Sequence, residues 1–279
     1  LFEQREFELA LSDSDSCNTD LSKYMGLASL YALKRIDEGF ERIDRQSLSD
    51  PKNIRTAAFA AFMSSIEARN TTNNFCTDPM SFLYFSKLSR HLDNDSKFSA
   101  ELIKELGNYQ TVWEPSGRST TKGLQTNKNI NLLDQQSANI LELRAIILAE
   151  IESYFSLFKD ETCIFIQEAP MEKDLLGWHV ILKQQGHQSP HIHPTGWLSG
   201  VIYLQVVPCL GKHEGAIEFS VNGQYHSDKR VPKMLHQPAQ GDIILFPSSL
   251  YHRTVPFTTD TDRITISFDL IPKARPAQR

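Results

Sequence analysis

Apolar side chains recur every three to four residues along the first part of the chain, which is the spacing that places them on one helix face. One such row runs over residues 21–43 and another over 58–66. Shorter segments with the same spacing follow at 80–91 and 99–106. The pattern therefore predicts that residues 1–105 form a helical N-terminal region.

The pattern of hydrophobic and polar residues changes further along the chain. A polar stretch at 114–131 predicts a surface loop, and the longest helical pattern follows at 134–158, with Asp134 or Ser137 as its cap. Short runs rich in β-branched and aromatic residues then alternate with Gly, Pro and Asn, which is typical of a sandwich or barrel. These runs are 163–167, 178–183, 198–206, 216–220, 242–246 and 263–271. We expect an α+β chain in which residues 106–279 form an all-β domain with the long helix packed outside it.

Composition narrows the classes of function. The 279 residues carry a net charge of −5, which gives no electrostatic reason to expect nucleic acid or an acidic membrane as a partner. No long uncharged apolar run is present, so we expect no membrane span. The four cysteines form no CxxC pair, which excludes a zinc ribbon and favours reduced thiols in the cytoplasm.

Histidines gather in the β region, where eight of the nine lie between His179 and His252. In an extended strand the side chains of His191 and His193 would share one face about 6.5 Å apart, so both could bind one metal ion. His252 follows the strand predicted at 242–246 and is the natural third ligand of a facial set. Four histidines have polar surroundings and are expected at the surface: His187, His213, His226 and His236.

The last predicted strand places Arg263, Thr265 and Ser267 on one face and apolar residues on the other. A buried row of this kind is costly unless it meets an anion, and a guanidinium suits a carboxylate. The alternative is an edge strand with one solvated face, which would show the same alternation.

Three segments, 191–204, 241–252 and 263–268, together resemble the iron(II)/2-oxoglutarate-dependent oxygenases. They are most similar to the oxygenase branch often found alongside tetratricopeptide repeats, over about residues 109–272. The resemblance implies a double-stranded β-helix, or jelly-roll barrel. It also implies that His191 and His252 are iron ligands and that Arg263 binds the distal carboxylate of 2-oxoglutarate, with Tyr203 and Ser267 contacting the same group.

The third ligand position departs from the common pattern of that superfamily. Most of its members have His-x-Asp or His-x-Glu, whereas this chain has His193. His193 is either a third iron ligand or a neighbour of a two-histidine site that contacts other groups. Three-histidine iron sites also occur among cupin dioxygenases, which use no 2-oxoglutarate.

The resemblance implies an oxidoreductase that uses Fe(II), 2-oxoglutarate and dioxygen, with ascorbate as a candidate reductant, to hydroxylate a protein or a small molecule. Two alternatives remain. One is a cupin-type dioxygenase that does not need Arg263, and the other is a binding or scaffold module without tight metal. Trp178 and Trp197 are candidates for the substrate mouth, with core packing as the other role for at least one of them.

Overall fold

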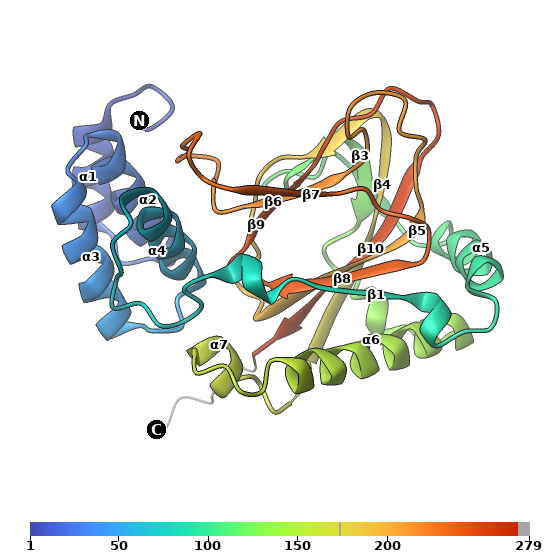
Figure 1. Ribbon diagram of the computed structural model, residues 1–279. Helices are drawn as coiled ribbons and strands as arrows, with labels where there is room; N and C mark the ends of the chain where they lie inside the picture. Colours follow the sequence, from blue (N-terminus) through green and yellow to red (C-terminus); the bar gives the residue numbers. More distant parts are fainter. Residues whose placement is uncertain (173, 273–279) are drawn as a thin grey trace.

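The computed structural model describes residues 1–172 and 174–272. The helices of the first 67 residues gather at one end, and two antiparallel sheets with one long and two shorter α-helices make up most of the rest (Figure 1). In the described part of the chain, no helix is both long and apolar enough to span a membrane.

Four helices form a cluster at the N-terminal end, which we call the helical cluster. They are α1 (Phe7–Ser16), α2 (Asp20–Ala32), α3 (Ile36–Ser49) and α4 (Ile54–Glu67). The apolar row of 21–43 spans two helices, because Lys34 between them has a left-handed backbone (φ 60°). Thr19 and Ser22 cap the start of α2 reciprocally, and the side chain of Asn53 caps α4.

The helix expected at 80–91 is wrong, because this segment holds a strand between two short 3₁₀ turns. These are η1 (Pro79–Phe82), β1 (Tyr84–Lys87) and η2 (Leu88–Arg90). β1 pairs antiparallel with β8 (Asp242–Pro247). Its inward side chains, Tyr84 and Ser86, both donate hydrogen bonds of 2.7 Å to the buried Glu150. Partners distant in sequence therefore set the conformation of β1, and the sheet takes a strand from within residues 1–105.

The loop expected at 114–131 is also wrong. After α5 (Asp95–Leu106), a hairpin of β2 (Thr111–Trp113) and β3 (Thr120–Thr126) extends the sheet, with β3 paired to β4. Trp113 at its outer edge is 49% exposed. A strand at the margin of a sheet can be polar because much of it stays in water.

The β region consists of one large and one small antiparallel sheet. The large sheet has the order β1-β8-β5-β10-β4-β3-β2, and the small sheet has the order β7-β6-β9. The remaining strands are β4 (Asp174–Gln188), β5 (Leu198–Gln205), β6 (Ile217–Ser220), β7 (Lys233–His236), β9 (Tyr251–Thr254) and β10 (Arg263–Ile271). β7 and β9 were not expected, and the strand expected at 163–167 is the short helix α7 (Ile164–Gln167).

Figure 1 shows the small sheet on one side of the large sheet and α6 (Ala138–Leu157) on the other. Between the sheets, side chains of β5, β6 and β8 form one buried cluster that includes Tyr203 and Phe219. The outer face of the large sheet packs against the stripe Ile140, Leu143 and Ile147 of α6, whose start Ser137 caps. The α+β fold with a double-stranded β-helix and a supporting helix is thus confirmed.

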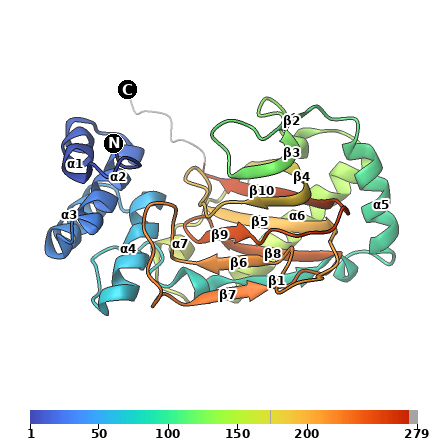
Figure 2. The same cartoon turned by 90° about the horizontal axis from the view of Figure 1, so that it is seen from above.

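The helical cluster contacts the barrel through the loop between β6 and β7, on the side of the barrel opposite α5 (Figure 2). Val221 and Val231 of this loop share a buried apolar cluster with α2, α3 and α4. His226 also lies here and is only 3% exposed, so its expected surface position is wrong. The helical cluster supplies the apolar surface that covers it.

Candidate metal centre

His191, His193 and His252 meet at one end of the barrel, where one ring nitrogen from each lies within 4.8 Å of the others. The backbones of His191 and His252 exchange two hydrogen bonds of 3.1 Å, which place the two residues opposite each other. The N–H of His193 donates to the carbonyl of Ser248 at 3.0 Å. The side chain of Ile192, between His191 and His193 in the sequence, points into the apolar core. Alternation along the chain and pairing to β9 thus bring the three imidazoles together.

Each of the three imidazoles has its Nδ1 atom beside a hydrogen-bond acceptor. His191 Nδ1 lies 2.7 Å from the Ser189 carbonyl, and His252 Nδ1 lies 3.1 Å from the Leu250 carbonyl. His193 Nδ1 lies 2.6 Å from a carboxylate oxygen of Asp269. A carbonyl or carboxylate only accepts, so each ring is fixed with its proton on Nδ1. The Nε2 lone pairs stay free, as a metal ion requires.

Burial keeps the ring nitrogens available. It lowers the pKa of His191 to about 3, with the nearby His193 adding to the effect. Burial also brings the pKa of His252 well below its usual value, followed in importance by the influence of His191 and His193. These imidazoles are therefore neutral at physiological pH. Neutral imidazole is a common ligand for iron and other divalent transition metals, so the donor set fits such an ion.

Arg263 lies inside the barrel and is 2% exposed. It begins β10, a central strand between β4 and β5, so the alternative of a solvated edge strand is wrong. Its guanidinium donates one hydrogen bond, from Nε to the Gly215 carbonyl at 3.3 Å, and lies 4.9 Å from the centre of the Tyr203 ring. In the described part of the chain, no carboxylate forms an ion pair with it. A buried cation of this kind is costly unless an anion binds beside it.

Tyr203 lies beside this guanidinium with a hydroxyl group that is fully buried. Among the described residues its oxygen has no hydrogen-bond partner. Burial raises the pKa of Tyr203 to about 12, although the charge of Arg263 acts in the opposite direction. The hydroxyl therefore stays protonated and can donate to an anion. Thr265 lies opposite Tyr203 in the sheet, and both it and Ser267 are buried on the face of β10 that Arg263 shares.

The two tryptophans have different roles. Trp197 is buried, donates a hydrogen bond to the Phe165 carbonyl at 2.8 Å and packs against Phe75, so it belongs to the core. Trp178 is partly exposed, and its ring centre lies 5.5 Å from that of His193. Of the two, Trp178 is the one beside the three histidines.

Asp269 is the site residue that sequence reasoning missed. Its side chain is 5% exposed and touches His193, as described above. Alternation from Arg263 through Ser267 places Asp269 on the same face of β10, so a signal was present. Its partner His193 lies in another segment, and that pairing was not visible from the pattern.

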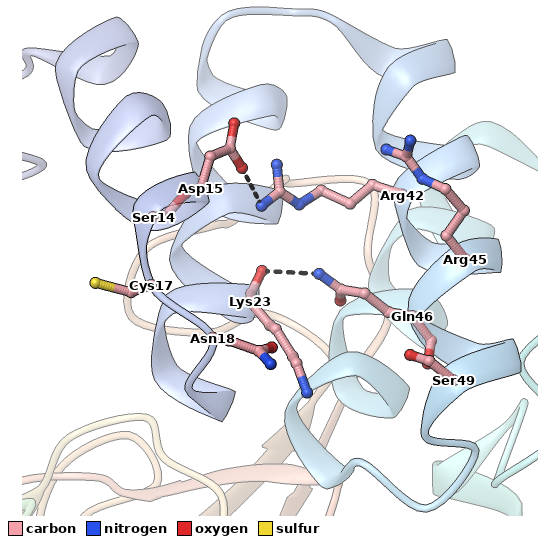
Figure 3. Close-up of a pocket in the computed structure, with 9 residues that line it drawn as sticks. All are labelled: Ser14, Asp15, Cys17, Asn18, Lys23, Arg42, Arg45, Gln46 and Ser49. Atoms are coloured by element: carbon pink, nitrogen blue, oxygen red, sulfur yellow. Dashed lines mark hydrogen bonds and ion pairs between the residues drawn. The ribbon is translucent and has the colours of Figure 1, made fainter.

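A cleft of about 510 Å³ lies elsewhere, on the helical cluster between α1, α2 and α3 (Figure 3). Arg42 in its wall pairs with Asp15, and Gln46 donates to the Lys23 carbonyl at 3.4 Å. None of the residues predicted for the site lines this cleft. The candidate chemistry therefore belongs to the barrel.

Residues 177–269, which run from β4 to β10, match the model of a family described as "Putative 2OG-Fe(II) oxygenase". All three histidines, Arg263 and Tyr203 lie within this range. The match confirms the resemblance and assigns this segment to the iron(II)- and 2-oxoglutarate-dependent oxygenases, whose cofactors are iron(II) and 2-oxoglutarate. No curated protein matches the chain.

Several solved structures resemble the chain at low identity. A prolyl-4-hydroxylase of Pseudomonas putida is 12% identical, with 71% of this chain and 97% of that chain covered and a TM-score of 0.45. HygX of Streptomyces hygroscopicus, solved with nickel and 2-oxoglutarate, is 11% identical over 71% and 85%, with a TM-score of 0.44. The epimerase SnoN of nogalamycin biosynthesis is 15% identical over 72% and 88%, with a TM-score of 0.47. At such scores, neither ligands nor substrates carry over to this chain.

Proposed function

We propose that the barrel is a hydroxylase centre in which His191, His193 and His252 together hold Fe(II). The observation that supports this most is the set of three imidazoles, each with one ring nitrogen within 4.8 Å of the others, in the same barrel as the buried Arg263, which has no ion-pair partner among the described residues. Bound iron with 2-oxoglutarate would supply the activation of dioxygen for oxidising a C–H bond. The cupin-type alternative gives no reason to bury an arginine without a partner, so we favour the use of 2-oxoglutarate.

In this proposal Arg263 binds the distal carboxylate of 2-oxoglutarate through its guanidinium fork. Tyr203 donates a hydrogen bond from its buried hydroxyl to the same carboxylate. Ser267, four residues after Arg263 on the same face of β10, adds a second hydroxyl. These groups lie between the two sheets, where water is excluded and a charge-assisted hydrogen bond is strong. The fixed Nδ1 protons of the histidines keep the rings aimed at one point before iron arrives.

The primary substrate is either a protein side chain or a small molecule. Trp178, partly exposed beside His193, offers an aromatic wall on which a substrate could rest. Four free thiols, two of them exposed, support a reducing compartment, and we propose the cytoplasm.

The test compares the visible spectra of anaerobic protein with Fe(II) in the presence and absence of 2-oxoglutarate. Chelation of Fe(II) by a 2-oxo acid gives a charge-transfer band, so no primary substrate is needed. We expect the band in the wild type, a weaker band in Arg263→Ala and none in His252→Ala. Arg230→Ala is the control, since Arg230 already pairs with the neighbouring Asp228. Iron binding without a band would favour the hypothesis of a three-histidine cupin-type dioxygenase. Absence of iron binding would favour the hypothesis of a binding or scaffold module and overturn the proposal.

A further inference from the structure

The carboxylate of Asp269 contacts the Nδ1 atom of His193, which leaves the Nε2 atom of that ring for a metal ion. One oxygen, Oδ1, lies 2.6 Å from His193 Nδ1 and accepts a hydrogen bond of 2.7 Å from Ser199 Oγ. The side chain is 5% exposed. Asp269 is therefore a buried carboxylate whose principal partner is one candidate metal ligand.

The charges of the centre make this contact informative. Three neutral imidazoles bring no negative charge to a divalent cation, and neither the Ser189 nor the Leu250 carbonyl behind the other two rings adds any. Within residues 1–172 and 174–272, His193 is the one basic side chain within ion-pair distance of Asp269. A buried carboxylate needs a compensating cation, and a metal ion on His193 Nε2 would provide it through the ring.

The surroundings hold this carboxylate in place. Ser199 Oγ lies 2.8 Å from Ser248 Oγ, and the Ser248 carbonyl in turn accepts the backbone N–H of His193. Gly196 leaves the necessary room, because a Cβ there would lie 2.6 Å from Ser248 Oγ and 3.2 Å from Asp269 Cγ. The backbone and ring of His193 are thus fixed by one connected buried group.

We propose that Asp269 is a positioning residue of the metal centre, which supplies through His193 the negative charge that three neutral imidazoles lack. The proposal rests on the proposed function, since it takes His193 as a ligand. It accounts for a histidine at a position where a directly coordinating carboxylate would otherwise bring the charge. Asp269 acts through His193 and does not itself reach the metal.

The test measures the affinity of the metal-free full chain for Ni(II) by calorimetric titration, so no substrate or turnover is needed. Asp269→Asn keeps an acceptor for His193 Nδ1 and removes the charge. We expect its Kd for Ni(II) to rise by about 10- to 100-fold, the usual range for losing such a partner, while the melting temperature of the metal-free protein changes little. Asp242→Asn is the matched control, because Asp242 is another buried aspartate beside a histidine, 3.1 Å from His236 Nε2.

A second measurement covers the case in which Asp269→Asn does not fold. In wild-type protein loaded with Zn(II) and labelled with ¹⁵N in histidine, NMR should show His193 with a metal-bound Nε2 and a protonated Nδ1. That proton should lie further downfield than those of His191 and His252, whose acceptors are neutral carbonyls. An unprotonated Nδ1 or a free Nε2 on His193 would overturn the proposal.

The outcomes separate the two proposals. Unchanged Ni(II) affinity in Asp269→Asn, beside a wild type that binds Ni(II) and gives the Fe(II)–2-oxoglutarate band, overturns the role of Asp269 alone. A wild type that binds no metal overturns the proposed function and this inference together.

Discussion

The imidazole Nδ1 of His226 lies 3.2 Å from the hydroxyl oxygen of Tyr24, which joins the barrel to the helical cluster through a buried polar contact. On its other side, His226 Nε2 donates to the Val221 carbonyl at 3.2 Å. The tautomer is therefore fixed, with Nδ1 accepting from the Tyr24 hydroxyl. The His226 ring also packs 5.3 Å from that of Tyr251, the residue before His252. The helical cluster thus contacts the strand that carries one candidate metal ligand.

Acid should destabilise the metal-free protein through His226. Burial lowers its pKa to about 3, whereas an unfolded histidine titrates near 6.5. Between these values the unfolded chain binds a proton that the folded chain does not, so stability falls as pH falls from about 6.5 towards 3. One such group contributes a slope of about 1.4 kcal/mol per pH unit.

Denaturant unfolding between pH 7.5 and 4.5 checks this expectation. His226→Asn should be less stable at pH 7.5 by about 2 kcal/mol, because it loses packing and hydrogen bonds in a buried site. Its stability should then fall less steeply with acid than that of the wild type. His213→Asn is the control, because His213 is exposed and asparagine tolerates its positive φ of 62°. Equal slopes in wild type and His226→Asn would contradict the assignment.

Metal should stabilise the protein, and its removal by a chelator should reverse the effect. A ligand at 100 times its Kd adds about 2.7 kcal/mol to the free energy of unfolding, enough to raise the melting temperature by several degrees. We expect this rise with Ni(II) in the wild type and in His187→Ala, whose histidine lies outside the three-histidine set. His252→Ala should show no rise. A rise of equal size in His252→Ala would place the metal elsewhere.

Two glycine substitutions should change stability in opposite directions. A Cβ at Gly200 on β5 would lie 2.2 Å from the Phe268 ring, so Gly200→Ala must displace that buried ring and should cost about 1–3 kcal/mol. A Cβ at Gly39 inside α3 would meet its nearest atom, on Met63, at 3.5 Å, and alanine favours helix by about 1 kcal/mol. Gly39→Ala should therefore raise the melting temperature. Destabilisation by both variants would contradict the packing described here.

Five strands of the barrel, β4, β5, β6, β8 and β10, were predictable because they carry their own signal. Segments such as 198–206 and 263–271 are buried on both faces, and their β-branched and aromatic residues favour strands. The candidate site was predictable for a related reason. The spacing of His191 and His193 and the alternation from Arg263 to Ser267 are local patterns, and the strand geometry carries them into the barrel.

The features that the sequence did not predict depend on contacts between distant segments, which no local pattern encodes. β1 has four residues and becomes a strand because β8, more than 150 residues away, pairs with it. His226 sits in a polar sequence, yet Tyr24 and Phe62 of the helical cluster bury it. The break between α2 and α3 falls at Lys34, which adopts a left-handed backbone although neither glycine nor proline marks the break in the sequence. Asp269 showed the right alternation, but its pairing with His193 needed the fold.

Arg263 should cost the metal-free protein stability in exchange for cosubstrate binding. Its buried guanidinium has one hydrogen bond and no anionic partner among the described residues, and apolar replacement of an unpaired buried charge is often stabilising. We expect Arg263→Met to unfold at a higher denaturant concentration than the wild type in the absence of ligand, with a free energy of unfolding higher by about 1–3 kcal/mol.

Added 2-oxoglutarate with Ni(II) should raise the stability of the wild type beyond the effect of Ni(II) alone, and this increment should vanish in Arg263→Met. Arg253→Met is the control: Arg253 pairs with Glu218 at 2.7 Å, so its loss should not stabilise the protein or abolish the increment. If Arg263→Met is less stable than the wild type and still gains stability from 2-oxoglutarate, the guanidinium serves the core and the carboxylate binds elsewhere.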